Sequence, residues 1–499
     1  MFAFLSPGAK PIKITAAIVF FWLLIAISYN YRSVYLLAPT SSRKTNVNTG
    51  TSAQSKTTSL ESIRLGAQYF VDYPLNDKPK EIFGELGQRT QLLRAWIEEL
   101  ENHEEHEKKE TAKLIGQLVE SLFPWLNSIN GVSPPLANIY GRLGISYKKT
   151  SVSKSDTAPA GIVIPTGDKT LRFACHLIAS LTQIHKTSLP IQVVYAGDGD
   201  LSPQGRKKIQ QAANGVKIDM LDVLTVFNDT ALKLAEGGWA IKPFAALASS
   251  YEKVILLDAD AVFFQDPLQL LHQDRFNETG VLLFHDRLLW KNGFADRQDW
   301  WHDQIKHPSP ETDKSLVWTE RYSEEGDSGI VVVDKSKLDV LLGLIHVGWQ
   351  NSDRVRNEVT YKITYGDKES WWIGFEATGS KYSFSPHYGG IVGWLQGPNE
   401  EKKDEVRVCS FVIAHVDQSD RLLWYNGGLL KNKAVNQTEF EVPTHWMIDQ
   451  TWHKGGSKKD MSCMAGTKAK ELENGEKSIL RKAIEAAKNV DEKLNLIPS

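Results

Sequence analysis

The chain has little cysteine and almost no net charge, and each scarcity excludes a class of protein. Three cysteines in 499 residues are too few for the disulfide framework of a small secreted scaffold, and an odd number leaves at least one thiol unpaired. Cys175 lies on the apolar face of a helix predicted at 169–185, so we expect it to be buried as a small hydrophobic residue. With 58 basic and 60 acidic residues, the net charge of −2 excludes a nucleic-acid-binding protein that relies on a basic surface.

A dinucleotide-binding loop is also missing. The strand, helix and strand pattern over 161–195 predicts a βαβ unit, but Gly197 and Gly199 after it do not complete a G-x-G-x-x-G loop. The missing third glycine therefore argues against a dinucleotide-binding fold. The turns after both strands still lie on the sheet edge where a nucleotide would bind. The candidate binding residues in these turns are Thr166, Gly167 and Asp198.

What the chain does contain begins with an uncharged segment at 14–31, which is long enough to span a bilayer. Its apolar core is longer than that of a secretory signal peptide and lacks a small-x-small cleavage site, so we predict a retained signal anchor. Lys10 and Lys13 precede the segment and Arg32 alone follows closely, which favours a cytoplasmic tail at 1–13. The protein is then a single-pass type II membrane protein whose remaining chain is lumenal.

Three N-glycosylation sequons agree with a lumenal chain, although such tripeptides also arise by chance. They begin at Asn228, Asn277 and Asn436. In the same compartment Cys409 and Cys463 can pair, and we state this disulfide as a hypothesis.

Composition and periodicity divide the rest of the chain. Residues 38–59 are rich in Ser, Thr, Lys and Asn and cannot bury enough apolar surface to fold, which predicts a stem. Apolar residues at three-to-four spacing follow, and a Lys- and Glu-rich stretch closes the chain with an amphipathic helix. The predicted parts are a stem at 32–80, a helical accessory region at 81–150, a catalytic domain at 155–453 and a charged helical tail at 454–499.

The chain is organised around a buried strand at 254–257 that two carboxylates follow. Asp258 and Asp260 come directly after this apolar run, at the carboxyl end of a strand where α/β sheets bind ligands. Two carboxylates so close together need a cation nearby to ionise together in a dry site. Hard ions such as Mg²⁺ or Mn²⁺ suit them and also accept phosphate oxygens, which predicts a metal-diphosphate site. The alternative is a surface turn with two solvated acids.

Other polar groups stand beside apolar runs. Lys242 opens a helix before the D-x-D strand and can contact phosphate or the two acids, or it can be a surface lysine. His415 lies among aliphatic residues, where a hydrogen-bonded core histidine is the alternative to a third metal ligand. The remaining candidates for substrate binding are His285, Asp286, Asp327 and Ser328.

Several segments, taken in order, resemble the fungal Golgi α-1,3-mannosyltransferases of glycosyltransferase family 71. They are GIVIPTGDKTLRF at 161, IQVVYAGDGDLSP at 191, IKPFAAL at 241, VILLDADAVFFQDP at 254, LLFHDR at 282, DSGIVVVDK at 327, VTYKITYGDKESWW at 359 and HYGGIVG at 387. The resemblance covers about 160 to 420, and the order of the segments is more specific than any one motif.

This resemblance implies a GT-A fold, a Rossmann-like mixed sheet flanked by helices that binds a nucleotide sugar. It implies a Golgi membrane protein that transfers mannose from GDP-mannose to a mannose-terminated glycan or cell-wall mannan with retention. Mn²⁺ would be bound by Asp260 and His415, with Asp258 contributing through the ribose or a water of the ion. Arg172, in the first matching segment, is a further expected substrate-binding residue.

Alternatives remain at the level of linkage and of class. The residues HDR, DSGIVVVDK and TYGDKESWW in the matching segments favour an α-1,3 linkage. Relatives that form an α-1,2 linkage, however, share the D-x-D and G-D-K-E motifs. Asp258-Ala-Asp-Ala-Val262 also fits the D-x-D-x-[TV] of haloacid-dehalogenase-type phosphatases, where Asp258 would be the nucleophile. A non-catalytic sugar-binding module is the third possibility.

The acids predicted to face the sugar are Asp367 and Glu369. Retaining transfer passes through an oxocarbenium-like state, which needs a carboxylate or front-side attack assisted by the leaving phosphate. In an extended segment both acids share a face, whereas a helix that starts there separates them. The hypothesis is that Asp367 orients the donor mannose and Glu369 the acceptor hydroxyl or the cationic centre; the alternative is that both cap a helix, which leaves Asp327 and Asp286.

Overall fold

The structure is a computed structural model that describes residues 51–128, 131–147, 159–397 and 405–497 of the chain, with side chains from Ser59 onward. The predicted cytoplasmic tail and membrane anchor, at 1–31, lie outside the described residues, as does the first part of the stem. Among the residues that are described, no helix is both long enough and apolar enough to cross a bilayer.

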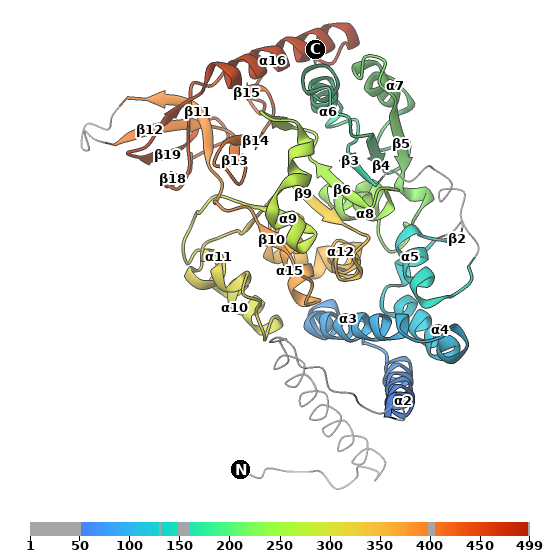
Figure 1. Ribbon diagram of the computed structural model, residues 1–499. Helices are drawn as coiled ribbons and strands as arrows, with labels where there is room; N and C mark the ends of the chain where they lie inside the picture. Colours follow the sequence, from blue (N-terminus) through green and yellow to red (C-terminus); the bar gives the residue numbers. More distant parts are fainter. Residues whose placement is uncertain (1–50, 129–130, 148–158, 398–404, 498–499) are drawn as a thin grey trace, which may run out of the picture. The chain divides into compact units, whose positions relative to one another are not determined.

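The centre of the molecule is a seven-stranded mixed sheet (Figure 1). β3 pairs in parallel with β4 and β6, and β9 alone runs antiparallel to its neighbours, β6 and β8. The α/β class with a mixed sheet flanked by helices is therefore confirmed. In sheet order the strands are β10 (Ser383–Phe384), β8 (Val281–His285), β9 (Gly326–Asp334), β6 (Lys253–Leu257), β3 (Ala160–Pro165), β4 (Ile191–Tyr195) and β5 (Ile218–Asp222).

Both faces of this sheet are buried, which explains why its strands are apolar throughout rather than alternating. Val254 and Leu256 of β6 point into one core, and Ile255 and Leu257 point into the other. Helices α8 (Ile241–Ala248) and α12 (Leu338–Gln350) cover the first face. Helices α6 (Leu171–Ala179) and α16 (Asn474–Leu494) cover the second. Buried Cys175 packs there, as expected.

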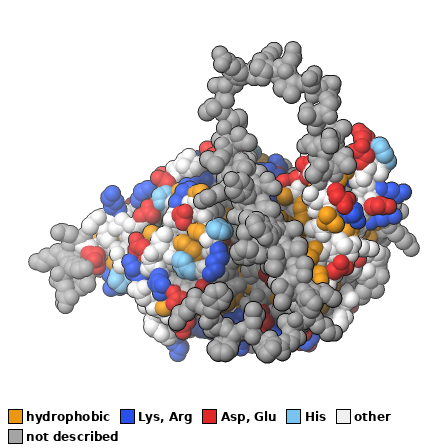
Figure 2. All heavy atoms as spheres, turned by 90° about the horizontal axis from the view of Figure 1, so that it is seen from below, with side chains coloured by type: hydrophobic (Ala, Val, Ile, Leu, Met, Phe, Trp, Pro, Cys, Tyr) orange, Lys and Arg blue, Asp and Glu red, His pale blue; other side chains and the backbone are white. Residues whose placement is uncertain are grey.

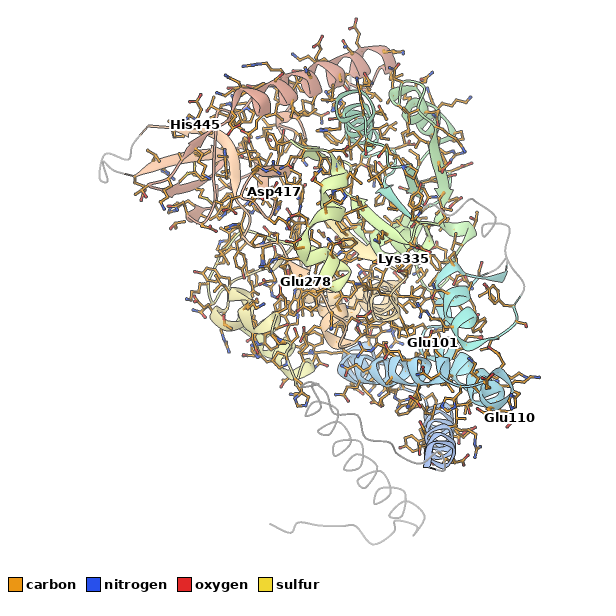
Figure 3. All side chains as sticks on the ribbon, in the orientation of Figure 1. Glu101, Glu110, Glu278, Lys335, Asp417 and His445 are labelled. Carbon is orange, nitrogen blue, oxygen red and sulfur yellow. A yellow bond between two sulfur atoms is a disulfide. The ribbon has the colours of Figure 1, made fainter. Side chains whose placement is uncertain are left out.

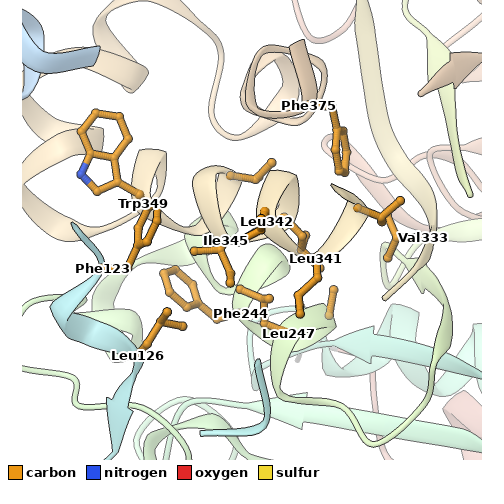
Figure 4. Close-up of a cluster of buried hydrophobic side chains, with 14 of the residues drawn as sticks. Phe123, Leu126, Phe244, Leu247, Val333, Leu341, Leu342, Ile345, Trp349 and Phe375 are labelled. Carbon is orange, nitrogen blue, oxygen red and sulfur yellow. The ribbon is translucent and has the colours of Figure 1, made fainter. Parts of the chain in front are cut away.

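The helical accessory region shares the first core with the sheet. Figure 4 shows Phe123 and Leu126 of this region beside Phe244 of α8 and Trp349 of α12. The accessory helices are α3 (Pro79–Glu101), α4 (Glu105–Leu122) and α5 (Pro134–Leu143), and the short strands β1 (Asn127–Ser128) and β2 (Gly131–Val132) pair between them.

The structure departs from the predicted stem at its carboxyl end. Helix α2 spans Thr51–Asp72, so it begins within the residues expected not to fold, 38–59, and lies inside the predicted stem, 32–80. Ile63 and Ala67, one helical turn apart, are buried in the first core, and this packing compensates for the polar composition around them.

The carboxyl-terminal part is integrated with the rest and is not a separate tail beginning at 454. Cys409 of β12 and Cys463 of β19 are joined by a disulfide, so strands on both sides of the expected boundary are linked. A six-stranded antiparallel sheet contains β11 (Ile391–Gln396), β12 (Val406–Ser410), β17 (His445–Met447), β18 (Thr451–His453), β19 (Ser462–Gly466) and β20 (Lys470–Glu471). Smaller sheets contain β7 (Ala261–Phe263), β13 (Ile413–Val416) and β14 (Leu422–Asn426), and the hairpin of β15 (Leu430–Asn432) and β16 (Asn436–Phe440).

Short helices complete the fold: α7 (Pro203–Ala212), α9 (Asp274–Thr279), α10 (Ala295–Gln304), α11 (Leu316–Glu320), α13 (Asp353–Val355), α14 (Tyr361–Ile363) and α15 (Lys368–Ala377). On the face shown in Figure 2, acidic and basic side chains are interspersed, in keeping with the near-zero net charge.

Candidate active site

The topology gathers the predicted residues at one edge of the central sheet. β3, β4, β6 and β8 all end at this edge, and β9 begins there because it runs in the opposite direction. The backbone N–H of Asp258 donates to the carbonyl of Gly329 at 2.8 Å, which ties the D-x-D to the start of β9. A methyl group on Gly329 would lie 2.6 Å from the Asn426 amide, so only glycine allows this close approach.

Lys242 connects three of the predicted site residues. Its Nζ lies 2.7 Å from Asp258 Oδ1 and 3.5 Å from Asp367 Oδ2, and it donates to the carbonyl and hydroxyl of Ser328 at 3.0 and 3.1 Å. Burial alone would lower the pKa of Lys242, but attraction to Asp258 and Asp367 raises it to about 12. Lys242 is therefore a buried ammonium that draws the D-x-D, β9 and the start of α15 together.

The two acids of the D-x-D have different surroundings. Burial raises the pKa of Asp258 to about 7, although Lys242 opposes the rise and part of the side chain remains exposed. Asp260 borders a shallow pocket of about 270 Å³, including its open mouth, that Phe173, His176 and Gly428 also line. The Nζ of Lys433, on the β15–β16 hairpin, forms an ion pair with the Asp260 carboxylate.

His415 is buried and faces Asp327 in the structure. Its Nε2 lies 3.0 Å from Asp327 Oδ2, and its ring stacks on Trp424 with centroids 4.3 Å apart. Asp327 Oδ1 also accepts hydrogen bonds from the Asn426 amide and the Gly329 N–H, at 2.9 and 3.0 Å. Burial opposes ionisation of Asp327, yet the hydrogen bond to His415 and the His415 charge hold its pKa well below the usual range.

Two of the three predicted metal ligands have the donor chemistry that a divalent ion needs, although each is paired with a lysine. Asp258 and Asp260 offer hard oxygen donors one residue apart, and Mg²⁺ or Mn²⁺ commonly uses one or two carboxylates together with substrate phosphates. His415 directs Nε2 to Asp327 instead, and within the described ranges no three His, Cys, Asp or Glu side chains form a group that could hold a metal. The metal site therefore remains a prediction, and it requires Lys433 to leave Asp260.

A second charged cluster lies at the end of β8. Lys368 Nζ forms an ion pair with Asp286 Oδ2 and lies 3.8 Å from Glu324 Oε2. Burial would raise the pKa of Asp286, but Lys368 and Arg287 lower it, whereas burial raises the pKa of Glu324. Glu324 was not among the residues predicted from the sequence. It lies just before β9, and because this antiparallel strand begins at the site edge, its position could have indicated a site residue.

The acids of the G-D-K-E segment are separated by a helix. Asp367 is the N-cap of α15 and Glu369 lies in its first turn. Glu369 Oε1 accepts from the N–H groups of Glu325 and Gly326, at 2.9 and 3.0 Å, and Oε2 accepts from the Trp372 indole at 2.8 Å. Burial raises the pKa of Glu369 to about 8. Its contacts hold the start of β9, while Asp367 alone reaches Lys242.

Three other candidates are engaged elsewhere. Arg172 makes two hydrogen bonds to Asp491 of α16, at 2.9 and 2.6 Å, because α6 packs against α16; its substrate contact is not supported by this position. Asp198 lies exposed beside Arg206 at 2.7 Å. His285 is stacked between Phe384 and Tyr388, and its Nδ1 lies 2.7 Å from Glu325 Oε1.

The remaining candidates are at the β3 end and on the surface. Thr166 Oγ1 is hydrogen-bonded to Thr170 Oγ1 at 2.7 Å, and Gly167 packs so closely on Asp200 that a methyl group would lie 2.1 Å from its carboxylate. The three sequon asparagines, Asn228, Asn277 and Asn436, are all exposed.

A family of mannosyltransferases, Mannosyl_trans3, matches residues 159–417, which is the region that contains this site. The chain belongs to this mannosyltransferase family. The resemblance found in the sequence is thereby confirmed. The match also disfavours the phosphatase alternative, as does the place of the D-x-D strand, which follows β3, β4 and β5 in the chain.

Individual relatives agree with the family. The chain is 30% identical to α-1,3-mannosyltransferase MNT3 of Saccharomyces cerevisiae, over 52% of this chain and 44% of the relative. It is 26% identical to α-1,3-mannosyltransferase MNT2 of the same yeast, over 54% and 51%. The chain thus spans about half of the length of these relatives. The solved structure of core-mannan synthase A from Aspergillus fumigatus in its Mn/GDP form is 12% identical over 46% of this chain and 73% of that one, with a TM-score of 0.30.

Proposed function

We propose that the protein is a retaining α-mannosyltransferase of GT-A fold that transfers mannose from GDP-mannose to a mannoside, forming an α-1,3 linkage. Family membership supports the transfer of mannose, and the names of the relatives support the linkage. The observation that carries the proposal is the D-x-D at the carboxyl end of β6, with Asp258 fixed by Lys242 and Asp260 at a pocket. An α-1,2 linkage is the alternative within the same chemistry.

Asp258 and Asp260 would hold the divalent ion, with His415 as the predicted third ligand once it turns from Asp327. When bound, Mn²⁺ supplies the positive charge that stabilises the departing diphosphate. Lys242 positions Asp258 and contributes charge beside it, so the D-x-D keeps its place as the ion and nucleotide enter. The Lys433 side chain is 39% exposed, so it can move into solvent when the ion takes its place beside Asp260.

At the sugar, Asp367 is the acid proposed to orient the donor mannose, because it shares Lys242 with the D-x-D. Ser328 shares Lys242 with Asp367 and is the second residue proposed to contact sugar hydroxyls. Asp327 can accept a hydrogen bond from the sugar only after His415 turns away, because its side chain is buried and bonded to His415 and Asn426. Glu369 acts as a positioning residue, since it holds the backbone of Glu325 and Gly326. Asp286 lies at the end of β8 near Asp327, and Lys368 holds it ionised, so it is the candidate to accept a hydrogen bond from the acceptor hydroxyl.

One assay separates the three classes considered. The full chain, purified in detergent, is incubated with a panel of nucleotide sugars and methyl α-mannoside, and the products are identified by NMR. We expect a disaccharide only with GDP-mannose, and an α-1,3 linkage. Release of inorganic phosphate from p-nitrophenyl phosphate, tested beside the panel, without transfer would indicate a phosphatase, and binding without any product would indicate a sugar-binding module.

We also propose that the catalytic region is lumenal in the Golgi, behind the predicted anchor at 14–31. Exposure of Asn228, Asn277 and Asn436 supports it, because a glycan can be accommodated at each. Endoglycosidase treatment of the protein from its native membrane should increase its mobility, and substitution of all three asparagines by Gln should abolish the shift. An unshifted protein whose catalytic region is digested by protease added to intact vesicles would contradict this topology.

A further inference from the structure

Between β8 and β9 the chain makes a long excursion over 286–325. Apart from Asp286, none of its residues has a role in the proposed transfer of mannose. Backbone hydrogen bonds hold its two arms together: Asp286 N–H donates to Glu325 O at 2.7 Å, and Ser323 N–H to Leu289 O at 3.0 Å. The excursion carries α10 and α11, which lie together outside the central sheet in Figure 1. Both arms start at the site edge, because Asp286 directly follows β8 and Glu325 directly precedes β9.

Two large aromatic side chains are exposed on this excursion. Trp290 is 54% exposed and Phe294 is 42% exposed, and their ring centroids lie 6.3 Å apart. Trp290 has φ +47°, and Asn292 after it has φ +62°. The left-handed region is rare for a bulky residue and costs free energy that the neighbouring structure must supply. About half of the Trp290 surface stays exposed in spite of this cost, which favours a binding role.

A guanidinium with unused donors lies next to these rings. Arg297 of α10 has its Cζ 4.3 Å from the centroid of the Phe294 ring. Its Nε and Nη2 are shielded from solvent and have no hydrogen-bond partner among the described residues. Burial lowers the pKa of Arg297, while Glu369 and Glu324 act in the opposite direction. Shielded donors without partners cost free energy, and a ligand with hydroxyl groups would satisfy them.

The acid of this group leads back to the site. Glu324 follows the returning arm and lies 3.8 Å from Lys368, which is paired with Asp286. Lys368 in turn lines a pocket of about 180 Å³ together with Asp327 and Ser328. Arg297 and Lys368 both attract the Glu324 carboxylate, so Glu324 links the guanidinium beside Phe294 to the candidate active site.

The chemistry of this surface fits a neutral, hydroxyl-rich ring. An indole offers an apolar face for the C–H groups of a sugar, and a guanidinium and a carboxylate donate to and accept from neighbouring hydroxyls. Glu324 and Asp286 disfavour an anionic ligand. We propose that Trp290, Phe294, Arg297 and Glu324 form the subsite that binds the acceptor mannoside, an inference that rests on the proposed function.

The first test measures binding of methyl α-mannoside to the full chain without donor, by saturation-transfer NMR. We expect binding by the wild type, binding about tenfold weaker in Trp290→Ala, and partial recovery in Trp290→Phe, because ring area is what stacks. Arg297→Met should weaken binding by a similar factor. Tyr73→Ala is the matched control, since Tyr73 is 57% exposed and lies directly after α2, more than 200 residues before Trp290 in the chain.

The second test separates this inference from the proposed function. In the transfer assay, Trp290→Ala should raise the KM for methyl α-mannoside about tenfold while the KM for GDP-mannose stays within twofold. No mannoside binding by the wild type, unchanged acceptor KM in both Trp290→Ala and Arg297→Met, or a parallel rise in the donor KM would overturn the subsite. A wild type that binds the mannoside but consumes no GDP-mannose would contradict the proposed function and leave the subsite supported.

Discussion

At the scale of single residues, Lys242 has the greatest influence on the candidate site, because it is the cation between Asp258 and Asp367. Lys242→Met would leave these two acids facing each other with no buried positive charge. Removing one partner of a buried ion pair typically costs about 3 to 5 kcal/mol. We therefore expect a loss of that order in the free energy of unfolding at pH 8, measured with urea.

The pH dependence of this loss identifies its cause. Burial holds the pKa of Asp258 at about 7, above its unfolded value, even though Lys242 lowers it. Lys242→Met should therefore raise this pKa further, and protonation of Asp258 at low pH should relieve the repulsion that the substitution creates. The difference between Lys242→Met and the wild type should grow as the pH rises from 6 to 9, and adding Asp258→Asn should reduce it. Lys217→Met, at a lysine whose side chain is 87% exposed, is the control. An equal loss at every pH would refute the electrostatic account.

The sequence predicted the residues whose role follows from local pattern. Asp258 and Asp260 come directly after an apolar strand, and the edge of the sheet then follows from strand direction. Lys433 and Asp260 are 173 residues apart in the chain, and no local pattern indicates their ion pair. The same holds for Glu369, where the acid itself was identified but its backbone partners, 43 and 44 residues earlier, were not.

At the scale of elements, α16 is held to α6 by one buried carboxylate. Asp491 accepts from Arg172 at 2.9 and 2.6 Å, and its Oδ1 lies 2.7 Å from His176 Nε2. Periodicity in the sequence predicts this helix at 477–494, and in the structure it spans Asn474–Leu494. The contact of Asp491 with Arg172, 319 residues earlier, was not predicted. Contacts between residues so far apart in the sequence leave no periodic pattern from which they could be predicted.

Asp491→Asn should leave Arg172 as a buried charge without its partner. We expect a loss of about 3 kcal/mol near pH 7, by the cost of breaking a buried pair, and early unfolding of α16 by hydrogen exchange. Burial opposes ionisation of Asp491, yet His176 and Arg172 lower its pKa, so the loss should shrink as the pH falls through the acid range. Glu492→Gln, at the exposed neighbouring residue, is the control and should have little effect. Equal thermal stability of the two variants would show that Asp491 does not hold α16 to α6.

At the scale of the whole molecule, we expect the stability of the fold to depend on pH through a buried lysine that follows β9, at the opposite end of this strand from the candidate site. Lys335, which Figure 3 labels, follows β9, and its Nζ donates to the Ser249 carbonyl at 2.7 Å and to the Ser249 hydroxyl at 3.2 Å. Burial lowers its pKa to about 7. Because the unfolded chain binds the proton up to a pH near 10.5, this group makes stability rise as the pH increases from 7 to 10.

Lys335→Met should remove this part of the pH dependence and stabilise the protein near pH 7, since a buried group without charge replaces one that ionises at a cost. The measurement is the free energy of unfolding at pH 7, 8.5 and 10, beside Lys217→Met as the exposed control. A difference from the wild type that does not narrow as the pH rises would show that Lys335 is not a buried titrating group.

In the function proposed above, Asp258 and Asp260 bind GDP-mannose through a divalent ion at the edge of the sheet. Calorimetric titration of the full chain with GDP-mannose tests it directly, with Mn²⁺ or with EDTA. Binding should require Mn²⁺ in the wild type, be lost in Asp260→Asn, and persist or tighten in Lys433→Met, because the lysine no longer competes for Asp260. Undiminished binding in EDTA, or in Asp260→Asn, would contradict the account.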